Sequence, residues 1–348
     1  MSSATPLGPI APHAGVVIPT YFSKKPPDDT VRELIWLTVR DCPHYVSPDD
    51  TWLVVDGDDR TATLAAETNE RFAEHYGRPY RLLVLPANGG KLWALREGLR
   101  RLLSERDDLR HAIIRDGDGD HLPAHIPALV AAAEALERFY GHTRLIVIGA
   151  RGSRHHPMGW VRGELETLLD HVTLDAVIWA LARQGRTPDL QHCREANPPD
   201  LSSGYKLYGR EEAECLVAAD PVFSTLSESD YWHYGPETCT IVEAFLRDTI
   251  VAQLPRLTWE QQPTTAFGEF QHTELYGELL LWVYARLEIP VGVAARMYDR
   301  RTSPLHLRTT PEGRKALDAL RLRVMEQLEL HLGDGGAAPP GNDVLSFL

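Results

Sequence analysis

The chain has 348 residues and a formal net charge of −13, and its hydrophobic (43%) and charged (24%) fractions are those of an ordinary soluble protein. This acidic balance argues against a nucleic-acid-binding protein, which needs a basic face. No stretch approaches the roughly 20 apolar residues that span a membrane, and four scattered cysteines fit a reducing compartment, so we expect a cytoplasmic protein without a transmembrane segment.

Short apolar runs alternate with helical patterns along the first 150 residues. The predicted strands lie at 15–20, 51–55, 80–85, 111–114 and 144–150, and the predicted helices at 30–40, 61–76, 91–103 and 126–139. Strands that alternate with helices in this way are typical of βαβ units. The predicted fold class is therefore α/β, with a mainly parallel sheet flanked by helices.

The rest of the chain has mostly helical patterns. The predicted elements are helices at 163–183, 210–218, 236–247, 275–287 and 313–332, with short strands at 204–209 and 257–260. The last residues, 333–348, are rich in Gly and Pro and are predicted to be disordered. The sequence therefore predicts a helical extension that follows the α/β part.

Polar side chains follow four of the predicted strands. Thr20 and Tyr21 end the first strand, Asp56 follows the second, Gly89-Gly90-Lys91 follows the third, and Asp116 follows the fourth. In an open α/β sheet, ligands bind beyond the carboxyl ends of the strands. We expect these four groups at one edge of the sheet.

The aspartates at 116, 118 and 120 are separated only by glycines. Carboxylates at alternate positions can converge on one cation, and Mg²⁺ takes one or two carboxylates together with phosphate oxygens. An acidic surface turn is the alternative, whereas an EF-hand lacks its closing Glu. The place of the run after a strand favours a metal and diphosphate site, with Asp118 as metal ligand, Asp116 on the ribose or the metal, and Asp120 on the surface.

Four segments, taken together, resemble family 2-type glycosyltransferases with a GT-A fold. They are residues 17–21, 54–59, 88–98 and 116–127, and the last, which contains the DxD pattern, is similar to dolichol-phosphate-mannose synthases. The match covers about residues 15 to 215. Residues 56–59 read Asp-Gly-Asp-Asp where the family often has Asp-Asp-Gly-Ser, so the resemblance leaves open whether Asp56 or Asp58 faces the base.

The second half is more loosely similar to glucosyl-3-phosphoglycerate synthases, through residues 162–169, 201–205, 234–237 and His272. The composition of the two ends and both resemblances together predict five parts of the chain. These are a flexible N-terminus (1–14), a nucleotide-sugar-binding half of the GT-A domain (15–150), an acceptor-binding half (151–272), C-terminal helices (273–332) and the disordered tail (333–348).

The function that the resemblance implies is a metal-dependent hexosyl transfer from a UDP- or GDP-sugar to a hydroxyl of a small soluble acceptor, with Mg²⁺ or Mn²⁺ as cofactor. A sugar-1-phosphate nucleotidyltransferase is an alternative, but it needs a Gly-rich basic loop after the first strand, which residues 19–22 do not supply. A non-catalytic nucleotide-sugar-binding protein is a third hypothesis. A homodimer is left open, and no nucleic-acid partner is expected.

On the donor side, each candidate residue follows a strand or opens a helix. Pro19, Thr20 and Tyr21 would form the base pocket with Tyr21 stacking, and Asp56 or Asp58 would accept a base N–H. Lys91 opens a helix, where the positive helix end aids phosphate binding. Arg151 follows a strand and could balance the diphosphate.

On the acceptor side, the resemblance places a glutamate at Glu237 and a third metal ligand at His272. Glu237 would deprotonate the acceptor hydroxyl in an inverting enzyme, or only hold the acceptor in a retaining one. A neutral imidazole is a good ligand for Mn²⁺. Competing bases are Glu228, Asp230 and Glu243, and competing ligands are His306, His155 and His156.

Overall fold

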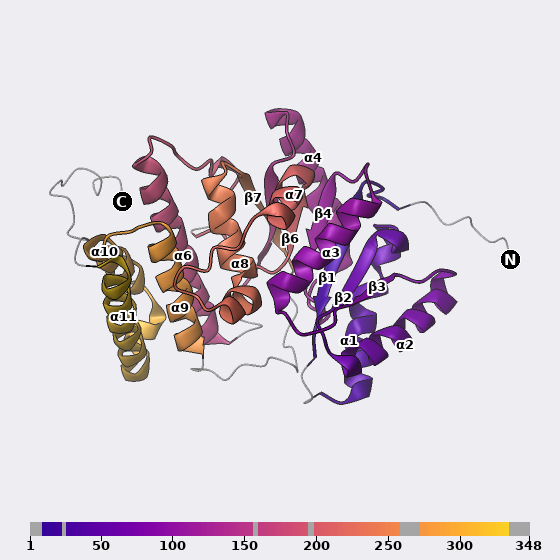
Figure 1. Cartoon of the computed structure of the whole chain (residues 1–348), viewed down its shortest axis with the longest axis horizontal. Coiled ribbons are helices and arrows are strands. Elements are labelled where there is room, and N and C mark those ends of the chain that lie inside the picture. Colours follow the sequence, from indigo (N-terminus) through magenta and orange to yellow (C-terminus); the bar gives the residue numbers. More distant parts are fainter. Residues whose placement is uncertain (1–8, 23–25, 156–158, 194–197, 258–271, 334–348) are drawn as a thin grey trace. The chain divides into compact units, whose positions relative to one another are not determined.

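The computed structural model of the chain (Figure 1) describes residues 9–22, 26–155, 159–193, 198–257 and 272–333. The chain divides into two units, each built from segments that are distant in sequence. The first unit comprises residues 1–150, 204–219 and 254–264, and the second comprises residues 151–203, 220–253 and 265–348.

A mainly parallel sheet forms the centre of the first unit. β1 (Ala14–Thr20) pairs in parallel with β2 (Thr51–Val55) and with β4 (His111–Ile114), and β2 pairs in parallel with β3 (Arg81–Val84). The antiparallel β6 (Lys206–Gly209) lies between β4 and β5 (Leu145–Arg151). With β7 (Ile250–Arg256) the strand order is β3-β2-β1-β4-β6-β5-β7. The predicted α/β class with a mainly parallel sheet is confirmed.

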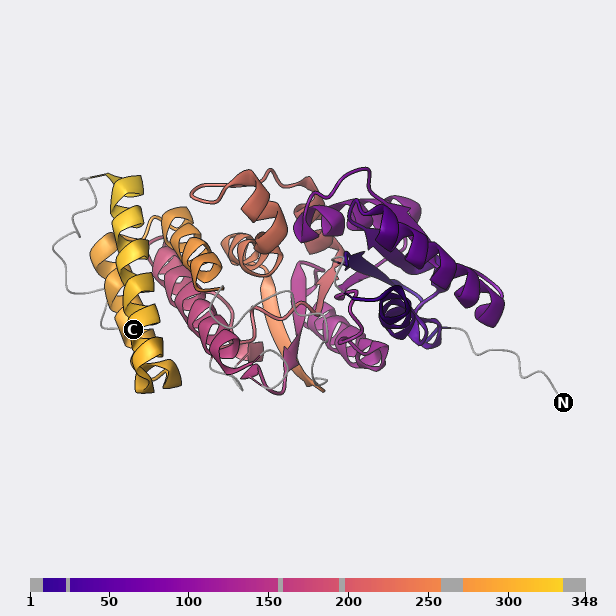
Figure 2. The same ribbon diagram turned by 90° about the horizontal axis from the view of Figure 1, so that it is seen from below.

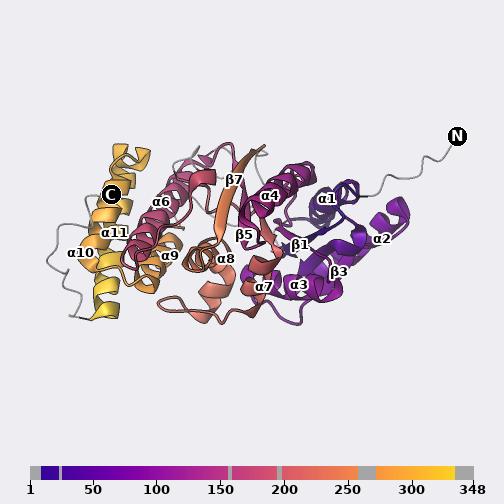
Figure 3. The ribbon, with the colours of Figure 1, turned by 90° about the horizontal axis from the view of Figure 1, so that it is seen from above.

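Helices cover both faces of this sheet. They are α1 (Asp28–Val39), α2 (Asp59–Tyr76), α3 (Lys91–Glu105), α4 (Ile126–Tyr140) and α7 (Arg210–Ala218). Figure 3 shows α1 and α4 on one side of the strands, with α3 and α7 on the other. The apolar side of α3 packs closely on β1: a Cβ at Gly98 would lie 2.5 Å from Val17, and one at Gly15 would lie 2.6 Å from Leu102. Small residues at these contacts let the helix approach the strand.

The second unit is built mainly from helices, namely α6 (Trp160–Ala182), α8 (Glu228–Leu246), α9 (His272–Arg286), α10 (Val291–Thr302) and α11 (Pro311–Leu332). α9 packs against α6 and α11, and α10 packs against α11 (Figures 1 and 2). Arg301 on α10 forms an ion pair with Asp175 on α6, with an N–O distance of 2.5 Å. The predicted helical C-terminal part is confirmed.

Short 3₁₀ segments join these elements at Cys42–His44, Pro48–Asp50, Pro123–His125, Gln191–Cys193 and His306–Thr309. Across the ranges that the structure describes, every helix is either too short or too polar to cross a membrane.

Three elements differ from the prediction. α8 begins at Glu228 rather than at Pro236, because the Ser227 hydroxyl caps the helix by accepting from the Asp230 N–H at 3.0 Å. β7 occupies residues 250–256, before the strand that was predicted at 257–260. It contains Pro255, which is untypical of a strand in the middle of a sheet but is tolerated here because β7 lies at the sheet edge. α10 was not predicted, and residues 258–260 of the predicted strand 257–260 lie outside the described residues.

Candidate active site

The carboxyl ends of β1, β2, β3 and β4 meet at one edge of the sheet. Thr20 is level with Val55 on β2, which is level with Val84 on β3. On the other side of β1, Ile114 is level with Val17. Because all four strands run in the same direction, the loops that follow them emerge together, which confirms that the polar groups after these strands share an edge.

Asp56 and Asp58, the predicted base contacts, hold the backbone around this edge. The Asp56 carboxylate is buried and accepts from the N–H groups of Gly89 and Gly90 at 2.8 and 2.9 Å. The Asp58 carboxylate accepts from both the N–H and the hydroxyl of Thr61, at 2.7 and 2.6 Å, and so caps α2. A contact of either aspartate with a nucleobase stays a prediction.

Lys91, which follows β3, forms an ion pair with Asp116, which follows β4. It is the first residue of α3, directly after Gly90, whose positive φ of 97° suits a glycine. Its Nζ lies 2.7 Å from Oδ1 of Asp116. Partial burial raises the pKa of Asp116, but Lys91 and His121 outweigh this effect and hold that pKa well below its usual range. Asp116 is therefore a permanent anion near neutral pH.

Asp118 has the opposite electrostatic balance. Burial, together with the nearby charges of Asp116 and Asp120, raises the pKa of Asp118 to about 7. Its Oδ1 accepts from the Asp120 N–H at 3.3 Å. A cation placed between Asp116 and Asp118 would relieve this repulsion, which is the electrostatic setting of a metal site.

The base-pocket candidates lie at the end of β1. Pro19 and Thr20 are buried, whereas the Tyr21 ring is 54% exposed beyond the strand. A Cβ added to Gly117 would overlap the Thr20 hydroxyl, so the loop that contains the three aspartates (residues 115–122, the acidic loop) packs directly on the end of β1. Tyr21 is therefore accessible beside the acidic loop, and its stacking on a base stays a prediction.

Sequence reasoning missed the residues behind the acidic loop. His121 is buried, its Nδ1 accepts from the Asp116 N–H at 3.0 Å, and its ring stacks on Tyr205 with centroids 5.0 Å apart. Arg256 donates to the Gly149 carbonyl at 2.9 Å and, after burial, is the main cause that lowers the pKa of His121. The signal in the sequence was a histidine five residues after Asp116.

Arg151, Glu237 and His272 belong to the second unit. Arg151 is 6% exposed and donates to Asp200 at 2.6 and 2.9 Å and to Glu166 at 2.8 Å. Two carboxylates thus already balance its charge within this unit. A role of Arg151 towards a diphosphate stays a prediction.

Glu237 lies inside α8, nine residues after its first residue, rather than in the first turn. Among the competing bases, Glu243 forms an ion pair with Arg286 at 2.6 Å, and Asp230 accepts from the Ser227 hydroxyl at 2.7 Å. A role of Glu237 as the base stays a prediction.

The predicted histidine ligands do not complete a metal site within the described part of the chain. α9 begins at His272, but the side chain of His272 lies outside the described residues, as does His156. Nε2 of His155 lies 3.1 Å from Glu164, and His306 opens a 3₁₀ segment. Among the residues that are described, no three or more His, Cys, Asp and Glu side chains group so that they could hold a metal ion.

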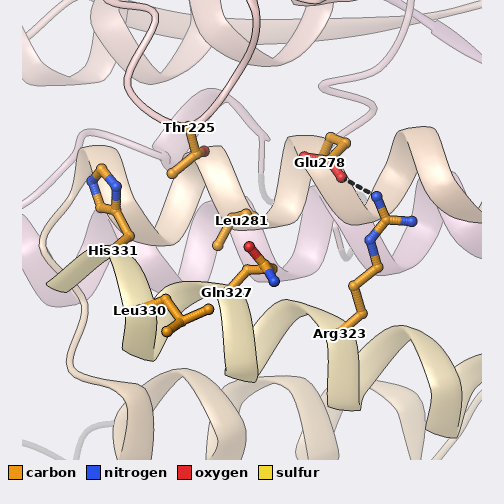
Figure 4. A pocket seen from close by; sticks show the side chains of 7 residues that line it. All are labelled: Thr225, Glu278, Leu281, Arg323, Gln327, Leu330 and His331. Atoms are coloured by element: carbon orange, nitrogen blue, oxygen red, sulfur yellow. Dashed lines mark hydrogen bonds and ion pairs between the residues drawn. The ribbon is translucent and has the colours of Figure 1, made fainter. Parts of the chain in front are cut away.

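The second unit also contains a surface cavity of about 540 Å³, between α9, α11 and the segment before α8 (Figure 4). An ion pair between Arg323 and Glu278 lies at one side of it. It contains none of the predicted site residues, and we assign it no function. Its lining residues are Thr225, Glu278, Leu281, Arg323, Gln327, Leu330 and His331.

The half-buried His171 on α6 gives the second unit a pH-dependent stability. Burial and the charges of Arg301 and Arg154 outweigh Asp175 and lower the pKa of His171 to about 4, from 6.5 in its unperturbed state. The folded unit therefore favours neutral His171. This stabilisation is complete above pH 6.5 and is lost as the pH falls towards 4, by up to about 3 kcal/mol.

We expect His171→Leu to remove this acid sensitivity. The measurement is the free energy of unfolding in urea between pH 7 and pH 4, for the wild type and the variant. The difference between the two proteins removes the pH dependence that the other titrating groups contribute equally to both. Asp170, whose pKa burial raises to about 6, acts in the opposite direction in both proteins. His331→Leu, which replaces an exposed imidazole of the same unit, is the control. Parallel pH curves for wild type and His171→Leu would contradict the prediction.

Comparisons with known proteins add distant structural likenesses. No protein-family model and no curated protein matches the chain. The mannosyltransferase PcManGT from Pyrobaculum calidifontis, solved with GDP-Man and Mn²⁺, is 14% identical with a TM-score of 0.44, over 99% of this chain and 81% of that one. GalNAc-T7, solved with UDP, GalNAc and Mn²⁺, is 11% identical with a TM-score of 0.43, over 96% of this chain and 59% of that one. At such low similarity neither likeness assigns a substrate to this chain.

Proposed function

We propose that the chain is a glycosyltransferase of the GT-A type, which moves a hexosyl group from a UDP- or GDP-sugar to a hydroxyl of a small acceptor. The observation that supports this best is the ion pair between Lys91 and Asp116, 2.7 Å long, beside Asp118 at the shared edge of four parallel strands. Carboxylates and a lysine at such an edge fit a diphosphate with its cation.

The chemistry of the loop residues fits Mg²⁺ or Mn²⁺. Asp118 and Asp116 supply the hard carboxylate oxygens that such a cation takes together with phosphate oxygens. Glycine is required at two positions around Asp116. A Cβ at Gly117 would overlap Thr20, and a Cβ at Gly204 would lie 2.5 Å from Asp116 Oδ2. When bound, the cation supplies positive charge to a leaving diphosphate. Asp118 and Asp116 would hold it, with His272 as the proposed third ligand.

In the proposed transfer, the acceptor oxygen forms a bond to the anomeric carbon of the sugar. The bond from that carbon to the phosphate oxygen breaks, and the nucleoside diphosphate leaves with the electron pair. Lys91 would place its charge near the leaving phosphate. The hydroxyl proton passes to Glu237 if the configuration inverts. If the configuration is retained, the proton passes to a phosphate oxygen of the leaving nucleoside diphosphate, and Glu237 only holds the acceptor.

A thermal-shift screen tests this proposal. UDP, GDP and their sugars are added with Mn²⁺, with Mn²⁺ and EDTA, or alone. A ligand at 100 times its Kd stabilises the native state by about 2.7 kcal/mol, which raises Tm by roughly 5 to 10 °C for units of this size. We expect such a rise for one nucleotide only, and its loss with EDTA.

Release of nucleoside diphosphate from the selected nucleotide sugar then separates an enzyme from a binding protein. We expect slow release that needs the metal and accelerates with a hydroxyl acceptor. Pyrophosphate release from a nucleoside triphosphate and a sugar 1-phosphate would instead identify a nucleotidyltransferase. A Tm that no nucleotide changes, without any release, would overturn the proposed function.

A further inference from the structure

In the acidic loop of the first unit, the His121 ring stacks on the ring of Tyr205. His121 (5% exposed) and Tyr205 (0% exposed) are buried, and their planes are inclined by only 14°. Tyr205 directly precedes β6, more than 80 residues further along the chain than His121. The stack therefore ties the loop after β4 to a neighbouring strand.

The hydrogen bonds of His121 fix which of its nitrogens carries the proton. Nδ1 accepts from the Asp116 N–H at 3.0 Å, so in a neutral ring the proton is on Nε2. Nε2 lies 3.8 Å from Asp116 Oδ2, so the ring also lies beside that carboxylate. One ring thus binds the backbone of Asp116 and lies beside its side chain.

The ends of the loop are held as well. The buried Arg115 donates to the carbonyl of His121, and the Tyr205 hydroxyl donates to the carbonyl of Leu122 at 3.1 Å. On the other side of Asp116, Lys91 lies on Oδ1 and the backbone of Gly204 packs against Oδ2. The Asp116 carboxylate therefore has little freedom to rotate.

We propose that His121 is a positioning residue, which presets the Asp116 carboxylate for its ligand, and that Tyr205 holds His121 in place. The contacts stand on the geometry alone, while their consequence for a cation and a diphosphate rests on the proposed function. A preset carboxylate loses less rotational freedom on binding than a mobile one, and groups that orient a metal ligand typically contribute 10- to 100-fold in metal affinity.

Hydrogen exchange of the peptide that contains residues 115–122 tests the contact without any ligand. His121→Phe keeps a ring on Tyr205 but removes the acceptor of the Asp116 N–H, so we expect its exchange to become at least about 10-fold faster. His121→Asn places an amide oxygen where Nδ1 stood and is expected to restore most of the protection. Tyr205→Phe keeps the stack, loses the bond to Leu122, and should have an intermediate effect.

His125→Phe is the matched control. His125 also contacts Tyr205, edge-on at 6.4 Å, and no hydrogen bond joins it to Asp116 in the part of the chain that the structure describes. Hydrogen exchange of residues 115–122 in His125→Phe should equal that of the wild type. Circular dichroism at the same temperature confirms that each variant is folded. Wild-type exchange in His121→Phe would overturn the inference.

Mn²⁺ titration in the presence of the nucleotide selected above tests the consequence. We expect Kd for Mn²⁺ to rise about 10- to 100-fold in His121→Phe and less in His121→Asn. An unchanged Kd in His121→Phe, despite faster exchange, would overturn the positioning role. A wild type that binds neither Mn²⁺ nor nucleotide would refute the proposed function instead, while the exchange experiment still decides whether His121 holds the loop.

Discussion

Replacing Asp118 by alanine is expected to abolish metal-dependent nucleotide binding. The change leaves Asp116 as the remaining carboxylate of the pair, and one of its oxygens is already engaged by Lys91. We expect Kd for the nucleotide in the presence of Mn²⁺ to rise at least about 100-fold, or about 2.7 kcal/mol. Isothermal titration calorimetry with UDP or GDP, at saturating Mn²⁺, measures this change.

The fold should survive this replacement, which separates a lost site from a lost structure. Because the pKa of Asp118 is raised to about 7 in the fold, ionised Asp118 destabilises the protein as the pH rises through 7. Without ligand at pH 8, the Tm of Asp118→Ala should therefore equal or exceed that of the wild type.

Asp120→Asn is the matched control for this prediction. The variant keeps the backbone N–H that donates to Asp118, and it removes one nearby negative charge. We expect nucleotide affinity close to that of the wild type. Wild-type affinity in Asp118→Ala would remove this residue from the metal site, and a large loss in Asp120→Asn would move the ligand to that position.

The edge of the sheet could be predicted because each of its parts is local in sequence. A buried apolar run followed by Asp or Gly marks a strand and its end, and β2 and β4 have the predicted bounds. Parallel direction then follows from the helices between the strands. The meeting of Asp116 with Lys91 is a consequence of this pattern, since both follow strands that end at the same edge.

The residues behind the loop could not be predicted in the same way. His121 is one of fifteen histidines, and what distinguishes it is a bond to the Asp116 backbone that forms only when the loop turns back. Tyr205 and Arg256 reach this place through β6 and β7, and the second of these strands contains Pro255, which is untypical of a strand within a sheet. Such contacts depend on the tertiary fold rather than on local periodicity.

Gly57→Ala is expected to cause the largest loss of stability among changes at the site. Gly57 has a φ of +59°, which costs a non-glycine residue energy, and an added Cβ would overlap the backbone of Ala87 and Asn88. A backbone cannot swing aside as a side chain can. The strain and the overlap together should lower the free energy of unfolding by about 4 kcal/mol.

The control is Gly77→Ala, at the end of α2. Gly77 has a similar φ of +76°, but nothing lies within 4 Å of an added Cβ, so only the backbone strain of about 1 kcal/mol is expected. Urea unfolding of both variants isolates the overlap, about 3 kcal/mol, as their difference.

The overlap in Gly57→Ala also pushes residues 87–88 away from Asp56. The Asp56 carboxylate binds the next two N–H groups and so sets the start of the helix that carries Lys91. Nucleotide affinity should therefore fall in Gly57→Ala and stay at the wild-type value in Gly77→Ala, and equal stabilities of the two variants would contradict the close approach of these loops.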